Sequence, residues 1–159
     1  MAEIQGYKGN KELLHLKKTA FLCSRKIPAL AVLKCYDWAI EQREKGNCII
    51  SGFHSKIEKD VFHYLAKGEQ PIILALPRGL KTKWPTELKR LVNTERLLII
   101  TPFETKIKRV TKETASVRNR LMVELADEIV IGYKNPGGNI EALFDSYNLC
   151  KPVSYLVKN

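Results

Sequence analysis

Three side chains that could bind an anion follow the first apolar run of the chain. Ser24, Arg25 and Lys26 supply a hydroxyl, a guanidinium and an ammonium group just before a predicted helix. The N-terminus of a helix presents unpaired backbone amide protons and the positive end of the helix dipole, and both favour an anion. A dinucleotide-binding loop would carry the glycines of G-x-G-x-x-G here, and this loop has none, so NAD or FAD is not expected. The loop predicts a site for a single phosphate group, with no cofactor.

Three further turns carry residue types that bind phosphate. Ser51 and Gly52 end the second apolar run, where Gly52 can take the positive φ of a sharp turn, and Lys56 adds a charge nearby. Ser55 is explained equally well as the cap of the next helix, with Glu58 completing a capping box. Of the other two turns, one leads into an Arg-Asn-Arg run that opens the next predicted helix, and the other holds a Gly-Gly pair that can form a backbone nest for an anion. Their residues are Arg118, Asn119, Arg120, Gly137, Gly138 and Asn139.

The elements that must position these residues follow from the hydrophobic pattern. Short apolar runs alternate with amphipathic stretches, which is typical of a mostly parallel sheet with helices on both faces. The expected strands are residues 19–23, 48–51, 71–76, 97–101, 128–132 and 152–156. The expected helices are residues 29–45, 57–67, 86–93, 117–126 and 140–148.

Right-handed crossovers would wind these units into an α/β fold, a single Rossmann-like doubly wound domain over residues 19–159. Residues 1–18 are expected to be a lead-in segment packed on that domain. In such sheets ligands bind beyond the carboxyl ends of the strands. All four candidate turns leave those ends, so we expect them to meet at one edge of the sheet.

The charge distribution points to a polyanionic partner. The 159 residues include 27 Lys and Arg against 17 Asp and Glu, a formal net charge of +10. Residues 78–90 hold an excess of four positive charges and residues 106–120 an excess of five, so these two stretches account for nine of the ten. Such an excess favours nucleic acid or another polyanion. The alternative is two solvated loops whose charge only keeps the protein in solution.

Other classes of protein are not supported by the sequence. The four cysteines have no C-x-x-C spacing and the three histidines form no close pair, so reduced thiols and no metal site are expected. No apolar run reaches about 18 residues, and the N-terminus lacks a signal-peptide pattern. We therefore expect a cytoplasmic protein that has no membrane partner.

Five short segments in order resemble the DNA-processing protein A family (DprA, also called Smf). They are Tyr7–Asn10, the pair Leu13 and Leu14, then Thr19–Arg25, Ile49–Gly52 and Arg118–Met122. The ordered match covers nearly the whole chain. The resemblance implies an extended Rossmann core that binds single-stranded DNA without chemistry, forms a homodimer, and passes the strand to the RecA recombinase during DNA uptake (natural transformation).

The resemblance also implies roles for individual residues. Ser24 and Arg25 match the phosphate-binding Gly-Ser-Arg loop, and Ser51 with Gly52 matches the adjoining Ser-Gly turn. Residues 118–120 match the Arg-Asn-Arg element, and Lys112 falls near a typically basic position of the strand-binding groove. Three departures from the family pattern are Cys23 in place of glycine, Lys56 in place of glycine, and Ala115 about where an aromatic residue often stands.

An enzyme remains the alternative reading. The turn at Gly137–Glu141 is closer to the Pro-Gly-Gly loop of the lysine-decarboxylase-like LOG enzymes, which share this sheet and cleave nucleoside monophosphates. Their catalysis uses an arginine and a glutamate, and Arg120 with Glu141 would supply that pair. The chain would then bind a mononucleotide or hydrolyse its N-glycosidic bond as a phosphoribohydrolase. A third reading is a degenerate family member that only dimerises.

Overall fold

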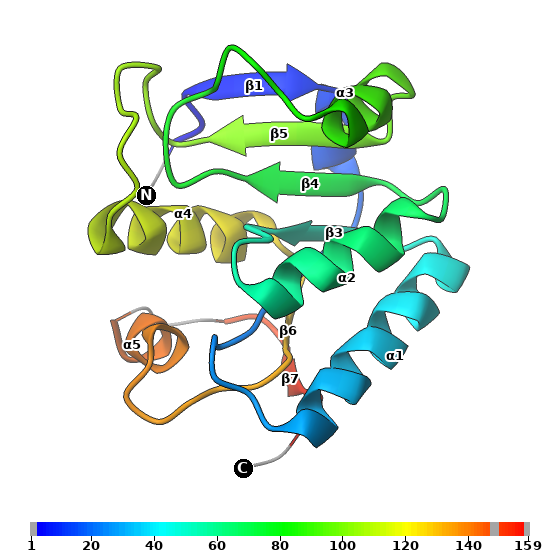
Figure 1. Cartoon of the computed structure of the whole chain (residues 1–159). Coiled ribbons are helices and arrows are strands. Elements are labelled where there is room, and N and C mark those ends of the chain that lie inside the picture. Colours follow the sequence, from blue (N-terminus) through cyan, green and yellow to red (C-terminus); the bar gives the residue numbers. More distant parts are fainter. Residues whose placement is uncertain (1–2, 147–149, 158–159) are drawn as a thin grey trace.

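Seven strands form one sheet in residues 3–146 and 150–157, the part of the chain that the computed structural model describes (Figure 1). The strands are β1 (Gly6–Gly9), β2 (Lys18–Leu22), β3 (Cys48–Ser51), β4 (Ile72–Ala75), β5 (Leu97–Thr101), β6 (Glu128–Ile131) and β7 (Val153–Tyr155). The helices are the 3-10 helix η1 (Lys11–His15) and the α-helices α1 (Ala29–Lys45), α2 (Lys56–Ala66), α3 (Thr86–Asn93), α4 (Lys112–Leu125) and α5 (Asn139–Ser146).

The order of the strands shows where a ligand should bind. The sheet runs β1-β5-β4-β3-β2-β6-β7, and every neighbouring pair is parallel except β1 with β5. The chain winds from β2 through β3, β4 and β5 in one direction and then returns to place β6 on the other side of β2. In open α/β sheets the ligand binds at this switch point, beyond the carboxyl ends of the strands. The loops after β2 and β6 therefore frame the expected site.

Both faces of the sheet are covered. One face packs against α1, α2 and α3 through a core that includes Phe21, Trp38 and Leu65. The other packs against η1, α4 and α5 through a core that includes Ile50, Leu121 and Leu143. Every residue of β2 and β5 is buried, as continuous apolar strands predict. The structure confirms the predicted Rossmann-like α/β fold. None of the helices found in the described residues is long and apolar enough to cross a lipid bilayer.

The sheet has one strand more than the six named from the sequence. Residues 6–9, expected as part of the lead-in, form β1 and pair antiparallel with β5. A strand this short, with glycine at both ends, carries no sequence signal of its own; it forms because β5 offers an unpaired edge. Gly9 ends it at φ 113°, and a Cβ there would lie 2.2 Å from the carbonyl oxygen of Leu97, so only glycine fits.

Among the described helices, α2 and α4 begin at capping boxes. Ser55 and Glu58 form the predicted capping box of α2, which the structure confirms. Helix α4 begins at Lys112, five residues before the predicted start at residue 117, because Thr111 and Thr114 form a second capping box. The Arg-Asn-Arg run thus lies inside α4 and does not open it, which corrects the prediction. Residues 147 and 148, the predicted end of the last helix, and the chain ends at 1–2 and 158–159 lie outside the described residues.

Candidate functional site

A cavity of about 520 Å³ lies at the carboxyl ends of the central strands. Its wall is built from the loop after β2, the start of α2, the start of α4 and the loop after β6. Four segments that are far apart in the sequence therefore meet at the switch point. In Figure 1 the arrowheads of β4 and β5 point left, and the loops that leave the strand ends lie on that side, next to α4 and α5.

The structure places eight of the thirteen predicted binding residues in the wall of this cavity and five outside it. In the wall are Ser24, Arg25, Lys26, Lys112, Arg118, Asn119, Gly138 and Asn139. Outside it are Ser51, Gly52, Lys56, Arg120 and Gly137. The wall also contains polar residues that were not in the predicted set, among them His54, Glu58, Thr111 and Asn135.

Ser24 joins the two loops at the switch point. Its hydroxyl oxygen accepts a hydrogen bond from the backbone amide of Asn135 (2.9 Å), and its own amide donates to the carbonyl oxygen of Tyr133 (2.9 Å). The Asn135 side-chain amide donates to the carbonyl oxygen of Lys26 (2.7 Å). These bonds fix the backbone that carries Arg25 and Lys26, whose side chains are exposed at the rim. The conformation of the loop is thus set by hydrogen bonds within the protein.

Glu58 lies buried at the base of the cavity and joins the loop after β2 to the turn before α2. Its carboxylate accepts hydrogen bonds from the backbone amides of His54 (2.9 Å), Cys23 (3.2 Å) and Ser55 (3.3 Å). Burial raises the pKa of Glu58, while the amide of His54 and the charge of Arg118 act in the opposite direction. The carboxylate therefore depends on its hydrogen bonds and on the nearby cation. The sequence signal for this residue was the capping box, which did not reveal its bond to Cys23.

Arg118 is the buried cation of the site. Only 5% of Arg118 is exposed. Its Nη1 donates a hydrogen bond to the carbonyl oxygen of Ala75 (3.4 Å), and its Nε donates one to Asn119 Oδ1 (2.8 Å). Burial lowers the pKa of Arg118, and the charge of Glu58 opposes that shift. A buried guanidinium of this kind orders the wall, whereas the exposed cations at the rim can move to meet a ligand.

Gly52 is required for a different reason from the one the sequence suggested. Its φ is not positive; the residue after β3 with a left-handed backbone is Phe53, at φ 43°. A Cβ on Gly52 would lie 2.2 Å from Arg118 Nη1, so glycine makes room for the buried guanidinium. Ser51 is fully buried, where its hydroxyl donates to the carbonyl oxygen of Phe21 (2.9 Å) and accepts from the amide of Phe53 (3.2 Å). Neither residue lines the cavity, but both contact residues that position its wall.

The remaining predicted residues point elsewhere. The Lys56 side chain is 84% exposed and pairs with Asp60 (3.0 Å). Arg120 is exposed, because it lies two residues and therefore about 200° around α4 from Arg118. Glu141 accepts a hydrogen bond from the amide of Gly137 (3.2 Å). The structure does not bring Arg120 and Glu141 to the cavity wall.

Comparison with solved structures shows the same fold in DNA-processing proteins. DNA processing protein A from Helicobacter pylori, a protein with a unique single-stranded DNA binding mode, matches 96% of this chain with a TM-score of 0.73 and 21% identity. The match spans 71% of that protein. DprA from Streptococcus pneumoniae matches 94% of this chain with a TM-score of 0.72 and 20% identity, and there the match spans 53% of the protein, about half its length.

A more distant likeness extends to a cofactor-binding protein. The molybdenum cofactor binding protein from Rippkaea orientalis matches 88% of this chain and 76% of its own, with a TM-score of 0.58 and 12% identity. At such identities these likenesses show the shared fold. No curated protein sequence matches this chain.

Membership is shown by the sequence of the chain as a whole. The family model for DNA recombination-mediator protein A matches residues 5–153, from before β1 to the start of β7. This confirms the resemblance that the short segments indicated. The chain belongs to the DNA recombination-mediator protein A family.

Proposed function

We propose that this protein binds single-stranded DNA through phosphate contacts at the cavity and catalyses no reaction there. The observation that carries the proposal is the arrangement of Arg25, Lys26 and Lys112 in the wall of one cavity at the switch point of the sheet. Family membership and the DNA-binding mode of the Helicobacter pylori protein support it.

The chemistry of the wall suits binding better than catalysis. The exposed cations at the rim can neutralise phosphates, and the side-chain amides of Asn119, Asn135 and Asn139 can donate or accept hydrogen bonds with a base or sugar. The buried carboxyl group, Glu58, has both oxygens engaged by backbone amides, so its role is to hold the wall in place.

Titration with a fluorescent oligothymidylate at several salt concentrations tests the proposal. Phosphate contacts release counterions, so the logarithm of the association constant should fall with the logarithm of the salt concentration by about 0.7 for each phosphate neutralised. A slope near zero would contradict phosphate binding. Competition by a nucleoside monophosphate at equal concentration, together with release of free base, would instead favour the mononucleotide enzyme.

The wider biology of the family gives further proposals for this chain. We propose that the protein forms a homodimer, acts in the cytoplasm during DNA uptake and passes the single-stranded DNA to the RecA recombinase. These proposals rest on family membership alone. Sedimentation equilibrium over a range of protein concentrations would test the dimer, and co-elution with purified RecA in the presence of a single strand would test the transfer.

His54 should make DNA binding depend on pH. Burial lowers the pKa of His54 below its ordinary value of 6.5, and the charges of Arg118 and Arg25 lower it further. A phosphate in the cavity would add negative charge beside the imidazole and raise that pKa, so binding takes up a proton. Affinity for an oligonucleotide without terminal phosphates should therefore rise about three- to tenfold between about pH 7.5 and pH 5.5.

Substitution of His54 by glutamine provides the control for this effect. The variant should bind with nearly constant affinity over the same pH range, because a phosphodiester does not titrate there. Equal pH dependence of the wild type and the variant would show that another group takes up the proton.

A further inference from the structure

Two basic loops outside the cavity lie against each other. The loop between β4 and α3 carries Arg78, Lys81 and Lys83, and the loop between β5 and α4 carries Lys106, Lys108 and Arg109. We call these six side chains the loop ridge. Both loops leave the carboxyl ends of parallel strands, so they extend the same edge of the sheet that holds the cavity.

Backbone contacts hold the two loops together. The amide of Gly79 donates to the carbonyl oxygen of Ile107 (2.7 Å), and a Cβ on Gly79 would lie 2.2 Å from the carbonyl oxygen of Glu104. The Thr101 hydroxyl donates to the carbonyl oxygen of Arg78 and accepts from the amide of Phe103. The backbone that carries the loop ridge is thus fixed, so binding a ligand would require ordering of the side chains alone.

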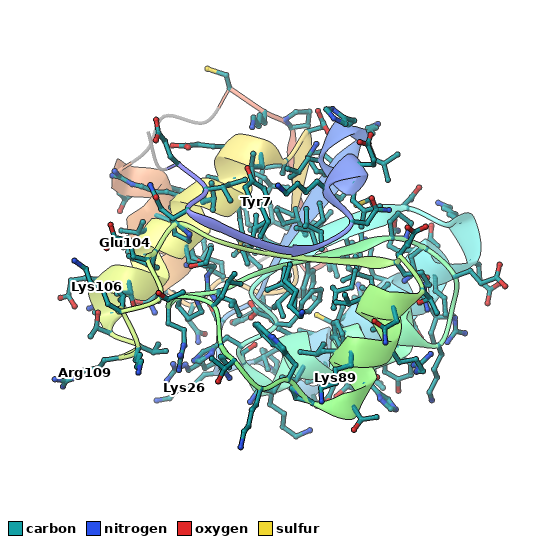
Figure 2. All side chains as sticks on the ribbon, turned by 90° about the horizontal axis from the view of Figure 1, so that it is seen from above. Tyr7, Lys26, Lys89, Glu104, Lys106 and Arg109 are labelled. Carbon is teal, nitrogen blue, oxygen red and sulfur yellow. The ribbon has the colours of Figure 1, made fainter. Side chains whose placement is uncertain are left out.

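The charge of the loop ridge is almost uncompensated. All its members are exposed except Arg78, which is half-buried. Within the described residues, the one ion pair formed by the loop ridge joins Lys106 to Glu104 (3.2 Å). Figure 2 shows Lys106 and Arg109 projecting at one side of the molecule and Lys89, on α3, at another. The basic stretch 78–90 is therefore divided: its loop residues join the ridge, and Lys89 and Arg90 lie apart on α3.

The loop ridge is adjacent to the cavity wall in the sequence. Arg109 is followed directly by Val110, Thr111 and Lys112, all three of which line the cavity. A DNA strand with one phosphate in the cavity can therefore extend along the exposed cations of the loop ridge, which lie next to the cavity wall. A ligand of one nucleotide would leave these cations unused.

We propose that the loop ridge binds the backbone of the nucleotides next to the one in the cavity, so that the protein holds the interior of a single strand. This rests on the proposed function of the cavity. The ridge contacts phosphates, and it should therefore add affinity and salt dependence without adding preference for a base sequence. Affinity should then increase with the length of the oligonucleotide until the ridge is filled.

The experiment compares two double variants that remove the same charges. Lys108→Ala with Arg109→Ala alters the ridge, and Lys89→Ala with Arg90→Ala removes one lysine and one arginine from α3. Each is titrated with oligothymidylates of about 3 and about 15 nucleotides at two salt concentrations. The ridge variant should bind the long strand about tenfold more weakly, with a salt slope smaller by about 1.4, and bind the short strand within about twofold of the wild type. The α3 variant should match the wild type on both strands.

Four outcomes would overturn the inference. Equal losses in the two variants would mean that only net charge matters. An equal loss on the short and the long strand would mean that the β5–α4 loop acts on the cavity itself. If both variants bind the long strand as the wild type does, while Arg25→Ala does not, the cavity binds DNA and the ridge does not. Failure of the wild type to bind either strand would refute the function proposed for the cavity as well.

Discussion

Replacing Arg25 by alanine should weaken binding of single-stranded DNA about thirtyfold and leave the stability of the fold unchanged. Arg25 lines the cavity from an exposed position, and hydrogen bonds made by Ser24, Asn135 and Lys26 fix its backbone independently of its side chain. A charge-assisted contact to phosphate contributes about 1.5–3 kcal/mol, which corresponds to roughly ten- to 150-fold in affinity. Fluorescence anisotropy would measure the affinity, and urea denaturation would measure the free energy of unfolding.

Two control variants separate the guanidinium from its charge. Lys89→Ala removes a positive charge on α3, outside the residues that line the cavity, and should leave affinity within about twofold of the wild type. Arg25→Lys keeps the charge and loses the paired hydrogen bonds of the guanidinium, so it should recover the salt slope and only part of the affinity. The loss should be the same on every base sequence. If Arg25→Ala binds with wild-type affinity, the loop after β2 is not part of the DNA-binding site.

The fold could be predicted because its signals are local and agree with one another. Residues 29–45 form α1 with the predicted bounds, and the helix ends at Gly46, whose φ of 73° is one that glycine readily adopts. The apolar runs of β2 and β5 have no polar side that could face water, so helices on both faces follow from the sequence. Strand β1 could not be predicted in this way, since it exists only as a partner for the edge of β5.

The site could be predicted only as far as the ends of the strands. Which side chains of α4 line the cavity depends on which face of the helix is turned inward. The buried face is marked by Leu121, Met122 and Leu125, which follow residue 118 at helical spacing. This pattern turns Arg118 inward and Arg120 outward. The missed start of α4 had a physical cause: its capping box has threonine in place of the usual glutamate or glutamine at the third helical position.

Replacing Arg118 by methionine should destabilise the protein by about 2–4 kcal/mol at neutral pH and by less in acid. Methionine fills much of the space, but the carboxylate of Glu58 then lies buried without its cation and its pKa rises further. An unfolded chain has an ordinary glutamate pKa, near 4.5 in a model compound. The folded variant therefore holds a proton on Glu58 at pH values where the unfolded chain has lost it, so its stability falls as the pH rises above about 4.5. Urea denaturation at about pH 5 and about pH 8 would show the difference.

Two comparisons assign this loss to the interaction with Glu58. Arg96→Met removes a guanidinium that donates to the carbonyl oxygens of Leu65, Ala66 and Gln70, with no buried carboxylate beside it, so its cost should not change between these pH values. In a Glu58→Gln background the Arg118→Met substitution should cost less than in the wild type, because no buried negative charge remains. If the cost of Arg118→Met is the same at both pH values and in both backgrounds, Arg118 stabilises the wall through its bond to Ala75 and its packing against Gly52 alone.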